Sequence, residues 1–145
     1  MGEMMRILYL NTGSCNGCDI EILVALLRLE EELGRELPVD TSIRESNYDV
    51  AIITGPVTAQ SLCRIVRQVA HVGKLSIGNV ICVGSCACGG GIWYDTYATL
   101  GGFDSFLDFV RKQGLRIDVG NIVYVTGCPA YPDDIYSAVK RALRI

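Results

Sequence analysis

The sequence predicts an α/β domain, in which a parallel sheet carries helices on both faces. Short runs of branched apolar residues recur along the chain without intervening polar residues, as is typical of strands buried on both faces. Helical patterns separate the runs, so strand and helix alternate and right-handed crossovers keep the strands parallel. With 145 residues, of which 50% are apolar, the chain is long enough to bury the core of one domain.

Apolar runs mark the expected strands, and the run at 39–43 is weaker than the others. In chain order, strands are expected at 7–10, 39–43, 50–54, 80–83 and 122–125. Helices are expected between and after them, at about 19–34, 58–72, 103–113 and 132–144. The stretch 85–102 has little regular pattern and exceeds the ~12–15 residues usual for a loop in a compact domain, which is typical of functional loops.

Composition and the ends of the chain narrow the class of protein. The net charge of −3 argues against a nucleic-acid binder with a basic surface. Residues 1–6 lack the pattern of a secretory signal, and no apolar run approaches the ~20 residues that cross a bilayer. We therefore expect a single domain, residues 1–145, in the cytoplasm, which reaches a membrane only through partner subunits.

Four of the seven cysteines each lie just past an expected strand: Cys15, Cys18, Cys86 and Cys128. Ligands of open parallel sheets bind outside the carboxyl ends of the strands, so these thiols are expected at one edge of the sheet. Small residues flank each of them, and these leave room for a bulky inorganic ligand. Because four thiolates commonly hold an iron–sulfur cluster, the pattern predicts one cluster there.

Other interpretations of the first cysteine pair remain open on the residues alone. A single C-x-x-C is also typical of a redox-active dithiol or of half a zinc site. A structural zinc site would more often use two close pairs, whereas Cys86 and Cys128 lie far apart along the chain. Cys88 could be a ligand, a neighbouring thiol or a redox-active spare. Cys63 and Cys82 lie within an expected helix and strand, where a free thiol acts as a small buried apolar residue.

Three titratable residues have ordinary structural interpretations. His71 ends the expected helix 58–72, where its charge, when present, complements the helix dipole. Asp19 and Glu21 follow the C-x-x-C pair at a helix start, where carboxylates are favoured by exposed N–H groups. The alternative is a role in moving protons beside the cluster, chiefly for Glu21.

Two segments are candidates for contact with another protein. The helix 19–34 is apolar on more than one side, so it is either sunk in the domain core or covered on its outer side by another subunit. In the long loop, aromatic residues gather with Asp95 as the sole charge, which favours an interface over packing within the domain. These aromatic residues are Trp93, Tyr94 and Tyr97.

Several short motifs together resemble the small subunit of nickel–iron hydrogenases. They are CNGCDIE at 15–21, TGPVT at 54–58, GSCA at 84–87 with GGGI at 89–92, and GCP at 127–129 followed by PDDI at 132–135. The resemblance is closest to the short small subunits of membrane-bound, energy-converting hydrogenases, which are homologous to the cluster-carrying subunit of respiratory complex I. It implies a flavodoxin-like domain with one four-iron four-sulfur (4Fe–4S) cluster.

Carried over residue by residue, the resemblance implies that the cluster ligands are Cys15, Cys18, Cys86 and Cys128, and that Cys88 is not a ligand. It also implies an electron relay without catalytic residues of its own, within an oxidoreductase complex. Electrons would pass between the nickel–iron centre of a partner large subunit and a ferredoxin-like iron–sulfur subunit. Membrane subunits of the complex would hold the chain at the inner face of the cell membrane.

Two rival functions remain. One is the equivalent subunit of a complex I-like quinone or sulfur reductase that lacks nickel. Complex I subunits have two adjacent cysteines in the first motif, whereas two residues separate Cys15 from Cys18, which favours hydrogenase. The other is a zinc-stabilised or dithiol binding module without electron transfer.

Overall fold

A computed structural model describes most of the chain. The described residues are 6–11, 17–55, 57–84, 87, 99–101, 103–112, 114, 116–127 and 130–143.

The main sheet has five parallel strands in the order β2-β1-β3-β5-β7. Numbered within the sheet, this is the 2-1-3-4-5 order of flavodoxin-like folds, and the predicted fold class is confirmed. The strands are β1 (Ile7–Asn11), β2 (Val39–Asp40), β3 (Asn47–Thr54), β5 (Leu75–Val83) and β7 (Ile117–Val125). A small antiparallel pair, β4 (Val57–Thr58) with β6 (Thr99–Gly101), was not expected from the sequence.

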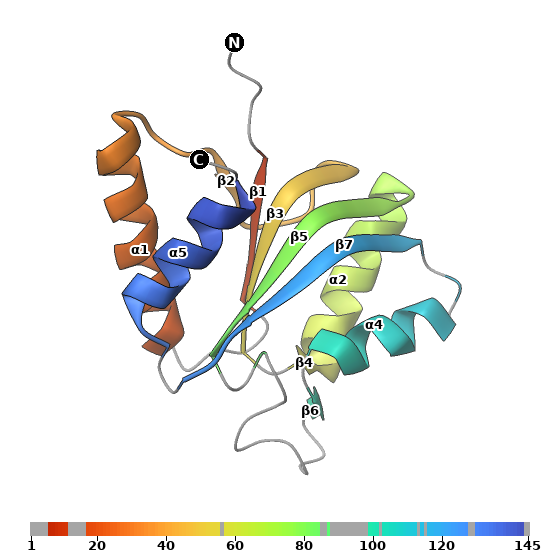
Figure 1. Ribbon diagram of the computed structural model, residues 1–145. Helices are drawn as coiled ribbons and strands as arrows, with labels where there is room; N and C mark the ends of the chain where they lie inside the picture. The colour runs from red at the N-terminus through yellow and green to blue at the C-terminus, as the bar shows by residue number, and fades with distance from the viewer. Residues whose placement is uncertain are drawn as a thin grey trace.

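Helices cover both faces of the sheet, as the alternation of elements predicts. In Figure 1, α1 and α5 lie on one face, and α2 and α4 lie on the other. Their bounds are α1 (Gly17–Leu33), α2 (Ala59–Val72), α4 (Phe103–Lys112) and α5 (Pro132–Ala142). None of the helices within the described residues is long and apolar enough to pass through a bilayer.

Each face of the sheet has its own apolar core, because successive strand residues point to opposite faces. In β3, Val50 and Ile52 contribute to the core under α1 and α5. Ala51 and Ile53 contribute to the core on the side of α2 and α4. The central strands are therefore apolar at consecutive positions.

The expected strands were too short at their amino ends. β3, β5 and β7 each begin several residues before the apolar run, at Asn47, Leu75 and Ile117. These early parts include polar or exposed residues, so they do not show the unbroken apolar pattern. The expected strand 39–43 is the opposite case, since β2 is confined to Val39–Asp40.

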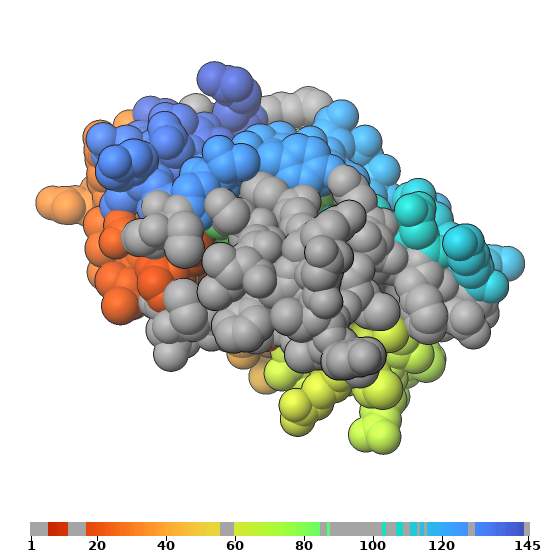
Figure 2. Space-filling model, turned by 90° about the horizontal axis from the view of Figure 1, so that it is seen from below, coloured from red at the N-terminus to blue at the C-terminus, as the bar shows by residue number. Residues whose placement is uncertain are grey.

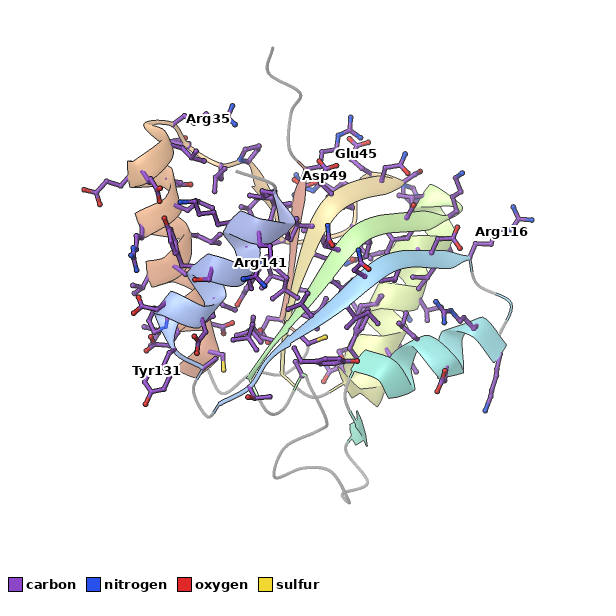
Figure 3. All side chains as sticks on the ribbon, viewed as in Figure 1. Arg35, Glu45, Asp49, Arg116, Tyr131 and Arg141 are labelled. Carbon is purple, nitrogen blue, oxygen red and sulfur yellow. The ribbon has the colours of Figure 1, made fainter. Side chains whose placement is uncertain are left out.

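Three strands approach closely where Asp49, Gly78 and Gly120 lie side by side; these three residues are named the glycine row below. A Cβ atom on Gly78 would lie 2.9 Å from the carbonyl oxygen of Asp49. A Cβ atom on Gly120 would collide with the carbonyl oxygen of Gly78. Figure 3 shows Asp49 at the end of the sheet opposite to Tyr131, which precedes α5.

The carboxyl ends of β1, β3, β5 and β7 meet at one end of the molecule (Figure 1), where α1, α2 and α5 begin. Figure 2 looks onto this end, with α1 and α5 on one side and α2 and α4 on the other. The sequence places all four candidate ligands in segments that follow these strand ends.

Candidate metal centre

Cys18 is the one predicted ligand that lies within the described residues. It occupies the first turn of α1, which begins at Gly17, two residues earlier than expected, and its side chain is half-buried. Cys15, Cys86 and Cys128 lie outside the described residues, as does Cys88. Gly84 and Gly127, which precede Cys86 and Cys128 in the chain, are described.

Gly84 lies close to both the thiol of Cys18 and the carbonyl group of Gly127. A Cβ atom on Gly84 would lie 2.5 Å from the Sγ atom of Cys18 and 3.6 Å from the carbonyl oxygen of Gly127. Gly84 also has a φ of +85°, which side chains rarely adopt. A glycine is thus required here on two grounds, and its missing side chain lets the sulfur atom of Cys18 pack against the Gly84 backbone.

This contact brings together the segments that carry the four predicted ligands. Gly84 follows β5 two residues before Cys86, and Gly127 directly precedes Cys128. Cys15 is joined to Cys18 by two residues. The Cys18 sulfur lies against the backbone of Gly84, and Gly84 and Gly127 lead in the chain to two more cysteines. This arrangement fits a thiolate-bound metal cluster. Within the described residues alone, no group of three or more His, Cys, Asp or Glu side chains could hold a metal ion.

Asp19 has a role that the sequence did not indicate. Its carboxylate accepts hydrogen bonds from the Tyr9 hydroxyl, from Asn11 Nδ2 at 2.8 Å and from Thr54 Oγ1 at 3.2 Å. Burial raises the pKa of Asp19, and the Thr54 hydrogen bond opposes that shift. The carboxylate thus ties the start of α1 to the ends of β1 and β3, beyond the simple capping role expected of it.

Asn11 is held from a second direction. The Arg64 Nη2 atom, on α2, donates a 2.7 Å hydrogen bond to the carbonyl oxygen of Asn11. The last residue of β1 therefore contacts both α1 and α2, on opposite faces of the sheet. No sequence signal could have indicated this pairing, because the residues come from three separate elements.

The two sides of α1 differ sharply in exposure. Ile22, Ala25 and Leu29 are buried against the sheet. The opposite side exposes four large apolar residues, here named the α1 stripe: Ile20 (61% exposed), Leu23 (58%), Val24 (47%) and Leu27 (54%). The hypothesis that this helix is sunk in the core is wrong, and cover by another subunit stays a prediction.

A groove of about 400 Å³ lies between α1 and the β1–β2 edge of the sheet. It shares Leu23 and Leu27 with the α1 stripe and has Asp19 and Tyr9 in its wall. The apolar surface of α1 thus continues from the stripe into a concavity that reaches the neighbourhood of Cys18.

The predictions for the other cysteines, for the histidine and for the aromatic loop have different outcomes. Cys82 is fully buried, as expected, but Cys63 is exposed. The prediction for Cys63 was wrong because the buried side of α2 carries Leu62, Ile65 and Val69, and residue 63 points away from it. His71 does lie in the last turn of α2. The aromatic residues of the long loop, Trp93, Tyr94 and Tyr97, lie outside the described residues.

Comparison with known proteins identifies the family. The model of the family "NADH ubiquinone oxidoreductase, 20 Kd subunit" matches residues 15–142. A probable membrane-bound hydrogenase subunit of Pyrococcus furiosus is 33% identical over 143 residues, which cover 99% of this chain and 76% of the relative. An NADH-quinone oxidoreductase subunit of Flavobacterium johnsoniae is 31% identical over 125 residues, 86% of this chain and 59% of that protein.

Solved structures support the fold. A NiFeSe hydrogenase from Desulfovibrio vulgaris Hildenborough contains a chain with a TM-score of 0.66 and 21% identity, and the match covers 99% of this chain and 60% of that one. An NAD⁺-reducing NiFe hydrogenase gives a TM-score of 0.59 at 17% identity, over 98% and 93% of the two chains. The chain therefore belongs to the family of the 20 Kd subunit of NADH ubiquinone oxidoreductase, and it is a subunit of an oxidoreductase complex.

Proposed function

We propose that the chain is the electron-relay small subunit of an energy-converting nickel–iron hydrogenase. In this proposal, residues 1–145 form a single domain that holds one 4Fe–4S cluster through Cys15, Cys18, Cys86 and Cys128. The observation that carries the proposal is the close approach of Gly84 to the Cys18 thiol and to Gly127 at the carboxyl edge of the sheet. Resemblance of the sequence motifs to hydrogenase small subunits supports the same ligand set.

The described residues around Cys18 fit such a cluster chemically. When bound, a 4Fe–4S cluster supplies transfer of one electron at a time. Cys18 lies in the first turn of α1, where exposed backbone N–H groups favour a negatively charged ligand. The backbone N–H groups of Gly55, Gly84 and Gly127, and of Gly13 outside the described residues, are candidate donors to cluster sulfur. No residue of this chain is proposed to make or break bonds of a substrate.

The α1 stripe supports assembly with a large subunit that carries the nickel–iron centre. It begins at Ile20, two residues after Cys18, so a subunit that covers the stripe would lie beside the cluster. Four large apolar side chains exposed on one side of a helix suit the core of an interface. A ferredoxin-like subunit would take the electrons onward, and membrane subunits would place the complex at the inner face of the membrane. The Pyrococcus furiosus relative, described as membrane-bound, supports that placement.

Cluster ligation can be tested in the purified complex. In Cys128→Ser, the reduced 4Fe–4S signal assigned to this chain in electron paramagnetic resonance should disappear, and hydrogen-dependent ferredoxin reduction should fall with it. Cys88→Ser is the matched control and should keep both. Full ferredoxin reduction by the Cys128→Ser complex would contradict the relay.

The contact between Gly84 and Cys18 can be tested with a pair of glycine variants. Gly84→Ala should lower the iron content of the chain, because the methyl group would collide with Cys18 Sγ at 2.5 Å and displace this predicted ligand. Gly73 has a similar φ of +88° but nothing within 4 Å of its Cβ position. Gly73→Ala thus reproduces the backbone strain alone and should keep the iron. Equal iron content in both variants would mean that the close approach of Gly84 to Cys18 Sγ is not needed for iron binding.

A second candidate is the cluster subunit of a complex I-like quinone or sulfur reductase without nickel. The family model and the 31% identity to an NADH-quinone oxidoreductase subunit favour it, whereas the C-x-x-C spacing favours hydrogenase. Nickel measured in the complex that co-purifies with this chain decides between them. Iron with nickel supports the hydrogenase, iron without nickel supports the reductase, and zinc without iron contradicts both.

A further inference from the structure

Asn11 and Asp19 lie at the two ends of the segment that contains Cys15 and Cys18. Asn11 is the last residue of β1, and Asp19 directly follows Cys18. The 2.8 Å hydrogen bond from Asn11 Nδ2 to Asp19 Oδ2 joins these ends. We name this pair the Asn11–Asp19 clasp. Both partners are described residues, and their contact closes the base of the ligand-bearing segment.

The clasp is anchored to the sheet and to α2. Asp19 also accepts hydrogen bonds from the hydroxyl groups of Tyr9 and Thr54, and Arg64 donates to the carbonyl oxygen of Asn11. Thr54 is fully buried. Each of these groups donates a hydrogen bond to Asp19 or to Asn11. Each acceptor atom of the clasp is therefore matched to particular donors.

These contacts lie directly beside a predicted cluster ligand. Asp19 follows Cys18 in the chain, and Asn11 precedes the segment that contains Cys15, so the contacts restrain both ends of that segment. Residues that hydrogen-bond around metal ligands commonly fix ligand orientation in this way.

We propose that the Asn11–Asp19 clasp positions the Cys15–Cys18 segment for cluster binding, with Asp19 as the central positioning residue. This inference rests on the proposed function, since it concerns the same metal centre. The clasp holds the two ends of the segment together before any metal is present. Its loss should therefore weaken retention of the cluster more than it weakens the fold.

The test uses the full-length chain, purified anaerobically and reconstituted with iron and sulfide. Asp19→Asn replaces one carboxylate oxygen with an amide NH₂ group, so the side chain can no longer accept hydrogen bonds from Asn11 on one side and from Tyr9 and Thr54 on the other. We expect a roughly 10- to 100-fold weaker retention of iron against a chelator, as for other residues that orient metal ligands. The line shape of the reduced cluster in electron paramagnetic resonance should also change, a readout that a purely structural residue would not move.

A swapped pair provides the rescue. Asn11→Asp combined with Asp19→Asn restores a hydrogen bond of reversed direction, and the carbonyl oxygen of the introduced amide can still accept from Tyr9 and Thr54. Iron retention should return toward that of the parent chain. Asp49→Asn is the control, because it alters an exposed carboxylate that accepts from the Arg6 backbone N–H at the other end of the sheet. It should leave iron retention unchanged.

The possible outcomes separate the two proposals. A parent chain that takes up no iron contradicts the proposed function itself. A parent chain that holds iron, with an Asp19→Asn variant that holds it equally well, overturns the clasp alone. Failure of the swapped pair to restore retention, with its melting temperature unchanged, also overturns it. If Asp19→Asn does not fold, Asn11→Ala replaces it, because that variant removes the same bond and leaves Asp19 with Tyr9 and Thr54.

Discussion

Two helices on opposite faces of the same sheet, α1 and α2, have very different outer surfaces. Both bury an apolar side, with Ile22 and Leu29 in α1 and Ile65 and Val69 in α2. The exposed side of α2 consists mainly of polar or small residues, namely Cys63, Arg64, Arg67, Ala70 and His71. The exposed side of α1 carries the α1 stripe. A helix that meets only a sheet and water has the pattern of α2, so the pattern of α1 indicates a second packing surface.

The difference is confined to residues 20–27 of α1. Farther along, Arg28 forms a 2.7 Å ion pair with Asp133 and lies 4.3 Å from the centre of the Tyr136 ring. Lys140 pairs with Glu32 at 2.8 Å. These polar contacts join α1 to α5 on the surface of the domain. The apolar part of α1 is therefore the part nearest to Cys18.

The largest expected effect is on the free energy of unfolding, and it should be similar for the two helices. Ile22→Ala in α1 and Ile65→Ala in α2 each remove a large side chain from a buried site, and each should lower the free energy of unfolding by about 2–5 kcal/mol. Chemical denaturation of the full chain measures this. A much smaller loss for Ile22→Ala would mean that α1 is loosely attached to the sheet, contrary to the observed packing.

The next effect concerns the outer surfaces of α1 and α2, which should respond differently to the same kind of substitution. Leu23→Glu, in the α1 stripe, should weaken assembly with the large subunit by about 2 kcal/mol or more, as for a central interface residue. Its effect on unfolding should stay within about 0.5 kcal/mol, because the site is exposed in the chain alone. Ala70→Glu on α2 is the matched control and should leave co-purification of the large subunit intact. Equal recovery of that subunit with both variants would contradict an interface at the α1 stripe.

The smallest effect tests the polar half of α1. Arg28→Ala removes both the exposed ion pair with Asp133 and the contact with the Tyr136 ring, and it should cost about 0.5–1 kcal/mol of unfolding free energy. The part that comes from the ion pair should shrink in concentrated salt. Denaturation at low and high ionic strength measures both values. A cost as large as that of Ile22→Ala would show that the surface contacts, and not the apolar face, hold α1 in place.

Much of the fold could be predicted from sequence, because its central strands are short apolar runs. Runs such as Ile52–Ile53 and Val80–Ile81 are apolar at every position, and this distinguishes a strand buried on both faces. The amino halves of the same strands were missed, since residues such as Asn47 and Ser76 carry no apolar pattern. The β4–β6 pair depends on a contact between distant segments, which no local pattern encodes.

The sequence supplies a set of predicted ligands for the candidate site, which stays a prediction, but it did not indicate the surroundings of Cys18. Four cysteines with glycines nearby could be identified after the expected strand ends, and the structure places Gly84 against Cys18 and close to Gly127. The hydrogen bonds of Asp19 could not be foreseen, because Tyr9, Asn11 and Thr54 reach it only after β1 and β3 have paired. Cys63 shows another kind of error. Neighbouring positions of a helix face different sides, and a thiol that was expected to be buried lies on the exposed side.

The glycine row has a consequence for the far end of the sheet. In Figure 1, β3, β5 and β7 fan apart toward their amino ends and converge toward their carboxyl ends. At the row the backbones approach closely, because no side chain separates them. A methyl group on Gly78 would meet the carbonyl oxygen of Asp49 at 2.9 Å, and one on Gly120 would collide with the carbonyl oxygen of Gly78. We therefore expect either substitution to push neighbouring strands apart at this end of the sheet and to destabilise the fold far from Cys18.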